Sequence, residues 1–289
     1  MASLNWQNRS VYFELMRVNR PIGTYLVAWP ALWALMLASA GRPDLVLVVV
    51  FCTGAFLMRS AGCVINDYAD RNWDGQIQRT KTRPFAEGRV SEKEALQLFA
   101  LLCLCAALLL FLTNTLTWWW SLGAVFLAGV YPFTKRITQL PQFVLGMAFA
   151  WAIPMAFAAQ INSVPQSVWV IYAAVIAWVV AYDTFYAMVD RDEDITAGIK
   201  STAILFGTYD RPITGLLQLT FTVLMAWTGL IFGVGTFYFI GLLIAAGLLI
   251  HQQWLIRNYN KDNCFKAFLN NHYVGMAIFV GLVLDSLTK

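Results

Sequence analysis

Residues 66–74 read NDYADRNWD and follow directly on an apolar run that begins near Leu45. Asn66, Asp70 and Asp74 are spaced four residues apart, so on a continuing helix they share one face. Three acceptor side chains on one face repel each other unless a cation lies among them, and oxygen ligands suit a hard cation such as Mg²⁺. The spacing therefore predicts a metal site, with a solvated acidic helix end as the alternative.

A second acidic stretch, YDTFYAMVDRDED at residues 182–194, also follows an apolar run. Its Asp190 and Asp194 repeat the four-residue spacing, and Asp183 lies seven residues before Asp190 on the same helical face. The Asp-Arg-x-x-Asp pattern of residues 70–74 recurs at residues 190–194. Half of the 16 acidic residues of the chain lie in these two stretches, and in so apolar a chain that concentration indicates a functional site.

Composition indicates a membrane protein, because 59% of the residues are hydrophobic and only 12% are charged. We predict an all-α fold, a polytopic membrane bundle of nine transmembrane helices that forms a single domain over residues 1–289. The predicted spans lie near residues 21–40, 45–66, 94–113, 117–134, 141–160, 167–186, 212–232, 235–256 and 266–285. The cysteines and histidines show no spacing that predicts a zinc site or a disulfide framework.

The basic residues orient the predicted bundle, because cytoplasmic segments of membrane proteins are enriched in Lys and Arg. Eighteen of the 20 lie on the side of the N-terminus, and only Arg42 and Lys289 fall on the other side. We therefore expect the N-terminus to be cytoplasmic and the C-terminus to be external. Both acidic stretches then lie at the cytoplasmic boundary, where the loops 67–93 and 187–211 form a polar cap over one mouth.

Basic side chains are interleaved with the carboxylates of this predicted mouth. Carboxylates that hold a hard metal, together with Arg and Lys, form the combination that binds a diphosphate. The candidates for phosphate contact are Arg71, Arg79, Lys81, Arg83, Arg191 and Lys200, with Lys135 and Arg136 in a third loop on the same side. The alternative for any one of them is a purely topological role as a cytoplasmic positive charge. A diphosphate held at the mouth of an apolar bundle implies a lipid tail between the helices.

Aromatic and intramembrane basic residues extend the predicted site below the mouth. Tyr131 lies near the cytoplasmic end of its span, and Tyr182 and Tyr186 lie beside the second acidic stretch; the ring faces of all three can stabilise a cation. Arg59 lies within a span, seven residues before Asn66 and so roughly on its face. An arginine that faces a cavity inside the membrane is functional by default.

Together these motifs resemble the UbiA family of intramembrane prenyltransferases. The first stretch fits the family pattern NDxxDxxxD at Asn66, Asp67, Asp70 and Asp74, and the second fits DxxxD at residues 190–194. Further matches are RVNRPIGT at 17–24, RTKTRP at 79–84, YPFTKR at 131–136 and GIKSTA at 198–203. One departure is PFAEG at 84–88, where the family often has PLPSG, and it bears on the local loop shape.

The resemblance implies a nine-helix bundle in the bacterial inner membrane that uses Mg²⁺. Residues 183–207, with CFKAF at 264–268, are similar to bacterial members that join polyprenyl diphosphate to 4-hydroxybenzoate in ubiquinone synthesis. In that reaction the allylic C–O bond ionises as the leaving diphosphate is stabilised, and the ring carbon ortho to the phenol attacks the carbocation. Besides these two substrates and membrane lipid, no nucleic acid and no obligate protein partner are expected.

The resemblance also assigns roles to individual residues. The implied catalytic carboxylates are Asp67, Asp70, Asp74, Asp183, Asp190 and Asp194. The implied metal ligands are Asn66, Asp70, Asp74, Asp190 and Asp194. The candidates that hold the carboxylate of the acceptor are Arg20, Arg59, Lys135 and Arg136.

Two alternatives remain. The first is prenyl transfer to a different aromatic acceptor, such as a naphthoate, a homogentisate or a haem. The second is a cation-coupled membrane transporter, since acidic residues within spans serve cation pathways. Transporters usually place their charges near the midplane of the membrane, whereas these two stretches lie together at one surface beside long basic loops.

Overall fold

The computed structural model describes residues 4–71 and 81–288, apart from the side chains of Trp6 and Lys135. Every regular element in this part of the chain is helical, which confirms the all-α class. The α-helices are α1 (Arg9–Leu15), α2 (Ile22–Ala38), α3 (Leu45–Asp70), α4 (Glu92–Leu109), α5 (Thr115–Ile137), α6 (Pro141–Ala150), α7 (Ala152–Ile161), α8 (Val168–Ala197), α9 (Thr202–Phe206), α10 (Asp210–Ile231), α11 (Thr236–Leu255) and α12 (Lys261–Leu287).

Each of the nine predicted spans falls in a helix or in a pair of helices. Among the described residues, seven segments are long and apolar enough to cross a membrane: α3, α4 with its 3₁₀ extension, α6 with α7, α8, α9 with α10, α11 and α12. The apolar α2 is shorter, at 17 residues, and α5 is not one of the seven. The chain is therefore a multi-pass membrane protein, and the count of nine crossings stays a prediction.

The fifth predicted span is a pair of helices and not one helix. α6 ends at Ala150 and α7 begins at Ala152. Pro154 has no N–H to donate to the carbonyl of Ala150, four residues before it, and its ring clashes with that carbonyl. The proline therefore accounts for the break.

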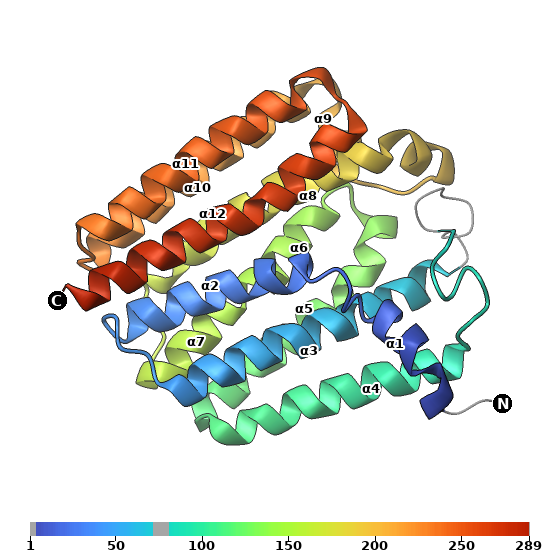
Figure 1. Cartoon of the computed structure of the whole chain (residues 1–289), viewed down its shortest axis with the longest axis horizontal. Coiled ribbons are helices and arrows are strands. Elements are labelled where there is room, and N and C mark those ends of the chain that lie inside the picture. The colour runs from blue at the N-terminus through green and yellow to red at the C-terminus, as the bar shows by residue number, and fades with distance from the viewer. Residues whose placement is uncertain (1–3, 72–80, 289) are drawn as a thin grey trace.

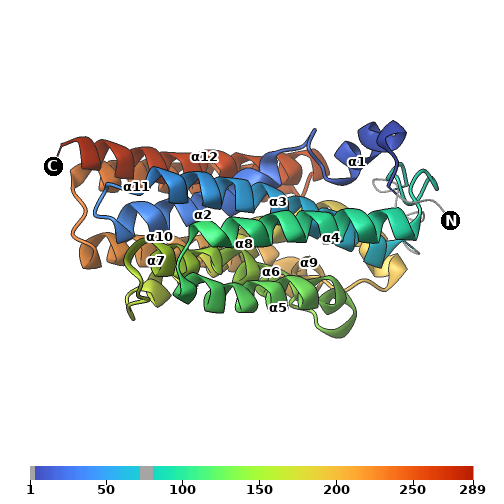
Figure 2. The ribbon, with the colours of Figure 1, turned by 90° about the horizontal axis from the view of Figure 1, so that it is seen from below.

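The long helices run side by side along one axis of the molecule (Figure 1, Figure 2). The two chain termini lie at opposite ends of this axis (Figure 1). The C-terminal ends of α3 and α8, which carry the two acidic stretches, lie at the same end as the N-terminus. Two stretches that are far apart in sequence thus share one end of the bundle.

α8 is the central helix of the bundle. In its most apolar window 67% of the residues are buried, against 28% in the corresponding window of α3. Trp178 of α8 stacks on Phe221 of α10 with ring centroids 5.5 Å apart, and it packs against Trp33 of α2 at 5.4 Å. The indole N–H of Trp178 also donates to Asn271 Oδ1 of α12 at 2.8 Å. These contacts fix α8 against three other helices.

α11 and α12 pack closely because small residues line their contact. A Cβ on Gly281 would lie 2.8 Å from the carbonyl oxygen of Phe237, so only glycine allows this approach of the two backbones. Buried amides add polar links across this side of the bundle. Gln218 of α10 donates to Gln252 of α11 at 2.8 Å, and Gln252 donates to Asn270 of α12 at 2.9 Å.

Candidate active site

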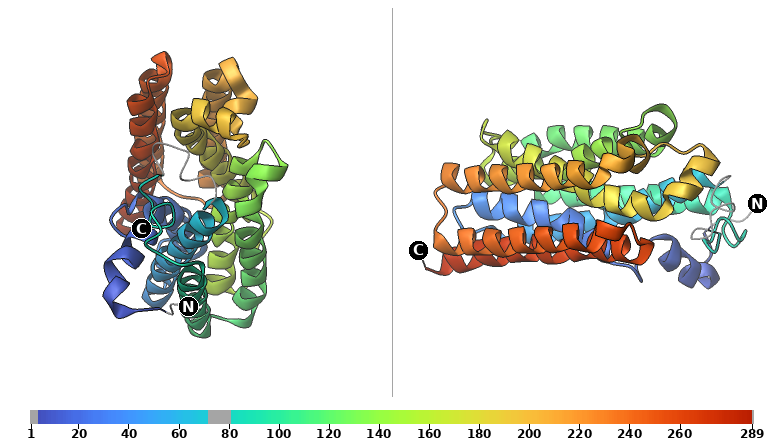
Figure 3. Two further views of the ribbon diagram at one scale, coloured as in Figure 1. Left: turned by 90° about the vertical axis from the view of Figure 1, so that its right-hand side faces the viewer. Right: turned by 90° about the horizontal axis from the view of Figure 1, so that it is seen from above.

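The two acidic helix ends meet at one cavity of about 830 Å³. Figure 3 (left) looks at this end of the bundle, along the helices. The cavity wall is charged at this end, where it includes Asp194 and Lys200, and it continues deep into the bundle past Val50 and Phe149 to Thr113. A charged mouth that leads into a long apolar interior suits a ligand with an ionic head and a lipid tail.

Most of the residues that the sequence pointed to line this cavity. They are Arg20, Arg59, Asn66, Asp67, Asp70, Arg83, Tyr131, Asp183, Tyr186, Asp190, Asp194 and Lys200. The predicted residues Asp74 and Arg79 lie outside the described residues, as does the side chain of Lys135. Tyr182, whose ring the sequence also pointed to, lines the cavity as well. Sequence reasoning did not assign Arg17, Asn19, Gln142 and Ser201, which also line it.

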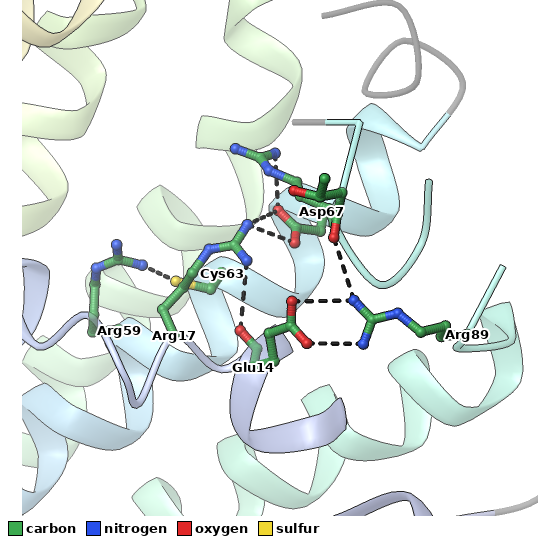
Figure 4. Close-up of polar contacts among 8 residues, drawn as sticks. Glu14, Arg17, Arg59, Cys63, Asp67 and Arg89 are labelled. Atoms are coloured by element: carbon green, nitrogen blue, oxygen red, sulfur yellow. Dashed lines mark hydrogen bonds and ion pairs between the residues drawn. The ribbon is translucent and has the colours of Figure 1, made fainter. Parts of the chain in front are cut away.

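Asp67 lies between two arginines at the end of α3 (Figure 4). Its side chain is 2% exposed. Arg17 Nη2 donates to its two carboxylate oxygens at 3.0 and 2.8 Å, and Arg83 Nη1 lies 3.0 Å from Oδ1. One buried carboxylate thus holds two guanidinium groups from distant segments on the cavity wall, and the three side chains together carry one net positive charge.

Arg17 reaches Asp67 from a strained turn between α1 and α2. Its φ is +58°, in the left-handed region, where a non-glycine residue costs of order 1 kcal/mol or more. The turn is held by Arg17 N donating to the Glu14 carbonyl at 2.9 Å. The only sequence signal for this role was the position of Arg17 at the start of the RVNRPIGT motif.

A second ion pair fastens α1 to the segment that carries Arg83. Arg89 donates to the two carboxylate oxygens of Glu14 at 2.8 and 3.1 Å (Figure 4). Arg89 also donates to the Thr82 carbonyl at 3.3 Å. The hydrogen bonds from Arg89 lower the pKa of Glu14 from its usual value.

Four of the predicted phosphate contacts do not line the cavity of the described residues and stay predictions: Arg71, Lys81, Arg136 and Arg191. Arg71 follows Asp70 by one residue, a turn of about 100° around the helix, and points to the outside. It donates to Glu92 at 3.0 Å and to the Tyr68 carbonyl at 2.7 Å. Arg136 donates to the carbonyl of Ala69 at 2.6 Å.

The end of α8 presents its carboxylates to the same cavity. Asp183, Asp190 and Asp194 line the wall, and Asp190 is buried. Carboxylates in the last turns of a helix face the negative end of its dipole, which disfavours them unless a cation compensates. Asp192 points elsewhere and lies 3.7 Å from Lys261. The cavity wall therefore fits a cationic ligand, with Asp190 and Asp194 near the end of α8 and Asp183 further back along the same helix.

Acceptor oxygens at the mouth of the cavity suit the binding of a metal ion. Asn66 Oδ1 is buried, lines the cavity and accepts no hydrogen bond. An orphaned acceptor oxygen near carboxylates is the chemistry that a hard cation requires. Within the described residues, no three Asp, Glu, His or Cys side chains already form a cluster that could hold a metal. The donor set fits Mg²⁺, with Asp74 outside the part of the chain that the structure describes.

Arg59 is a half-buried cation on the cavity wall below the mouth. Its Nη1 donates to Cys63 Sγ (Figure 4). A Cβ on Gly23 would collide with the guanidinium, so the glycine of the RVNRPIGT motif leaves room for Arg59 beside α2. Tyr186, on the same cavity, packs against Phe268 with ring centroids 4.9 Å apart.

Comparison with known proteins agrees with this geometry. The family model of the UbiA prenyltransferase family matches residues 27–278. The 4-hydroxybenzoate octaprenyltransferase of Serratia proteamaculans is 54% identical over 284 residues, which is 98% of each chain. The protein of the same name from Vibrio cholerae is 58% identical over 274 residues, 95% of this chain and 96% of that one.

Solved structures show the same fold. A UbiA homolog from Aeropyrum pernix K1 superposes with a TM-score of 0.80 at 24% identity, covering 90% of this chain and 97% of that chain. A UbiA homolog from Archaeoglobus fulgidus bound to GPP and Mg²⁺ gives 0.68 at 17% identity, with coverages of 95% and 99%. The chain therefore belongs to the UbiA prenyltransferase family.

Proposed function

We propose that this chain transfers a polyprenyl group from polyprenyl diphosphate to the ring carbon ortho to the hydroxyl of 4-hydroxybenzoate, releasing diphosphate, in ubiquinone biosynthesis. The observation that carries the proposal is the single cavity, whose charged mouth joins both acidic helix ends and whose interior is long and apolar. The relatives that are 54% and 58% identical over nearly their whole length bear the name of this activity.

Mg²⁺ is the proposed cofactor. Asn66, Asp70 and Asp190, with Asp74 and Asp194, would hold it at the mouth. When bound, the metal neutralises charge on the diphosphate and makes it a better leaving group. The Archaeoglobus fulgidus homolog of the same fold is a protein bound to GPP and Mg²⁺.

Basic residues around the mouth would complete the diphosphate site. Arg83 and Lys200 line the cavity beside the carboxylates, and Arg79 and Lys135 are assigned with them from the sequence. Asp67 is assigned a positioning role in place of direct contact with the metal, because two arginines occupy its carboxylate. Held in this way, Arg17 and Arg83 can donate charge-assisted hydrogen bonds to phosphate oxygens.

The acceptor would lie deeper, between the diphosphate and Arg59. Arg59 would take its carboxylate, which leaves the phenol end of the ring at the allylic carbon. Arg20 is the further candidate on the cavity wall for this carboxylate. The rings of Tyr131 and Tyr186 would face the carbocation, and the apolar walls would exclude water from it. Asp183 also lines this part of the wall.

The same proposal includes the membrane arrangement. The chain forms one transmembrane domain over residues 1–289 with nine crossings of the bacterial inner membrane. The N-terminus and the active-site mouth face the cytoplasm under a cap formed by the two long loops, and the C-terminus faces the periplasm. Support comes from the 18 basic residues that the predicted topology places on one side.

The test is turnover by the purified protein. It is incubated with Mg²⁺, octaprenyl diphosphate and a panel of aromatic acids, and products are identified by mass. We expect a 3-polyprenyl-4-hydroxybenzoate and released diphosphate. Selective product from a naphthoate or homogentisate would move the chain to another acceptor, and uptake into vesicles without any product would favour the transporter.

A further inference from the structure

The hydroxyl of Tyr182 is buried without a hydrogen-bond partner on the cavity wall. The residue is 1% exposed, and no atom of the described part of the protein pairs with its hydroxyl. Tyr182 nevertheless lines the cavity with Arg59 and Asn66. A buried hydroxyl that stays unpaired costs about 1–3 kcal/mol, so a native structure that retains one needs a reason.

The ring of Tyr182 is fixed, so the hydroxyl cannot turn to another partner. Trp178 meets it edge-on with centroids 5.2 Å apart, and Phe268 meets it edge-on at 5.9 Å. Trp178 is itself anchored by its 2.8 Å hydrogen bond to Asn271. The helix backbone and two aromatic neighbours thus hold the hydroxyl toward the cavity.

Tyr182 and Arg59 lie at a similar depth below the mouth. Tyr182 is eight residues before Asp190 on α8, and Arg59 is seven residues before Asn66 on α3. At 1.5 Å per residue, both lie roughly 10–12 Å from the carboxylate end. Both side chains line the same cavity, so one ligand can meet both of them.

We propose that the Tyr182 hydroxyl donates a hydrogen bond to the carboxylate of the aromatic acceptor, beside Arg59, and so helps to select acids. This assignment rests on the proposed function. A carboxylate has about four lone-pair positions and can accept from a guanidinium and a hydroxyl together. The phenol end of the acceptor is excluded as the partner, because it must lie nearer the mouth, where the allylic carbon is held.

The substitution Tyr182→Phe removes the hydroxyl and keeps the ring contacts. Steady-state kinetics of the full-length enzyme would compare 4-hydroxybenzoate with its methyl ester as acceptors. We expect KM for the acid to rise about tenfold or more, as for the loss of a hydrogen bond to a charged group. We expect KM for the prenyl diphosphate to change less than twofold, and KM for the ester to rise less than KM for the acid, because the ester carbonyl accepts only a weaker, neutral hydrogen bond.

Tyr238→Phe is the matched control. Its hydroxyl is equally buried but donates to the Met225 carbonyl at 2.7 Å, away from the cavity. We expect no change in KM for either acceptor in this variant. Thermal unfolding of both variants reports on the fold, and Tyr182→Phe, which removes an unpaired hydroxyl, should unfold at or above the temperature of the wild type.

Binding without turnover separates this inference from the proposed function. Calorimetric titration of 4-hydroxybenzoate, without donor, should show weaker binding to Tyr182→Phe than to wild type. Equal binding, an equal loss with acid and ester, or an effect on the donor alone would each overturn the role of Tyr182. Wild-type protein that makes no product would contradict the proposed function, and the titration still decides the role of the hydroxyl.

Discussion

The ends of α3 and α8 carry the same Asp-Arg pair, and both pairs are used in the same way. In each pair the aspartate lines the cavity and the arginine turns away from it. Arg71 bonds Glu92, the first residue of α4, and Arg191 bonds Asp210, the first residue of α10. A one-residue step around the helix therefore turns one side chain to the cavity and the next to the start of another helix.

The two pairs differ in burial. Arg71 and Glu92 are 29% and 59% exposed, whereas Asp210 is fully buried against Arg191. The end of α8 is thus locked into the core, while the end of α3 is held by Arg17 from the turn between α1 and α2 and by Arg83 from the loop after α3. We infer that the α8 end supplies a rigid half of the mouth and the α3 end a half that depends on its ion pairs.

The largest expected effect is the loss of activity when a cavity carboxylate is removed from the end of either α3 or α8. Asp70→Ala and Asp190→Ala should each lower kcat/KM by on the order of 10²–10³ or more, because each removes charge aimed at the metal and leaving group. Asp192→Ala is the control, since Asp192 lies on the same helix end but is exposed near Lys261. Full activity in Asp70→Ala or Asp190→Ala would show that the two helix ends do not both contribute to catalysis.

The difference in burial predicts a difference in stability. Asp210→Asn should destabilise the fold by about 3–5 kcal/mol, because it leaves Arg191 partly buried without its counter-ion. Glu92→Gln should cost about 1 kcal/mol or less, as for exposed pairs. Denaturant unfolding in detergent would measure both, and equal losses would show that the two pairs are equivalent.

Two residues at different depths along α3 should affect the two substrates differently. Arg59→Ala should raise KM for 4-hydroxybenzoate about 10- to 150-fold, the loss of one charge-assisted hydrogen bond. Asp67→Asn should have a smaller effect of a few-fold on KM for the prenyl diphosphate, because it loosens Arg17 and Arg83 without removing them. Steady-state kinetics with each substrate varied in turn would show reversed effects if the two pockets are assigned the wrong way round.

The smallest effect concerns the Glu14–Arg89 pair beside the α3 end. The pKa of Glu14 is lowered in the folded protein by its hydrogen bonds to Arg89, so its stabilisation is present above the unfolded pKa and is lost as pH falls through the folded pKa. Both groups are more than a third exposed, which limits the effect to about 1 kcal/mol. Glu14→Gln should lower Tm slightly at pH 7 and not at acid pH, and a pH-independent difference would contradict this.

Local sequence patterns predicted those features of the fold and of the site that depend on helix periodicity. The helical spans and the carboxylates at the ends of α3 and α8 follow from spacing alone, because four-residue steps return to one face. The direction of Arg71 away from the cavity follows from the same periodicity, since it is one residue past Asp70. The break between α6 and α7 is a consequence of Pro154, whose place inside the fifth predicted span is visible in the sequence.

Contacts between distant segments could not be predicted from the sequence. Arg17 meets Asp67 across 50 residues, through a left-handed turn that no local pattern specifies. Arg136 reaches a carbonyl of α3, which depends on how α5 packs. The unpaired hydroxyl of Tyr182 is visible only once its aromatic neighbours are placed.

The central claim is that the two helix ends form one metal and diphosphate site. Binding of a non-reactive prenyl thiolodiphosphate, measured by calorimetry with and without Mg²⁺, tests it directly. We predict that the wild type binds only with Mg²⁺ and that Asp70→Ala and Asp190→Ala each abolish this binding while the protein stays folded. Binding that does not need Mg²⁺, or that survives in one of the two variants, would contradict the claim.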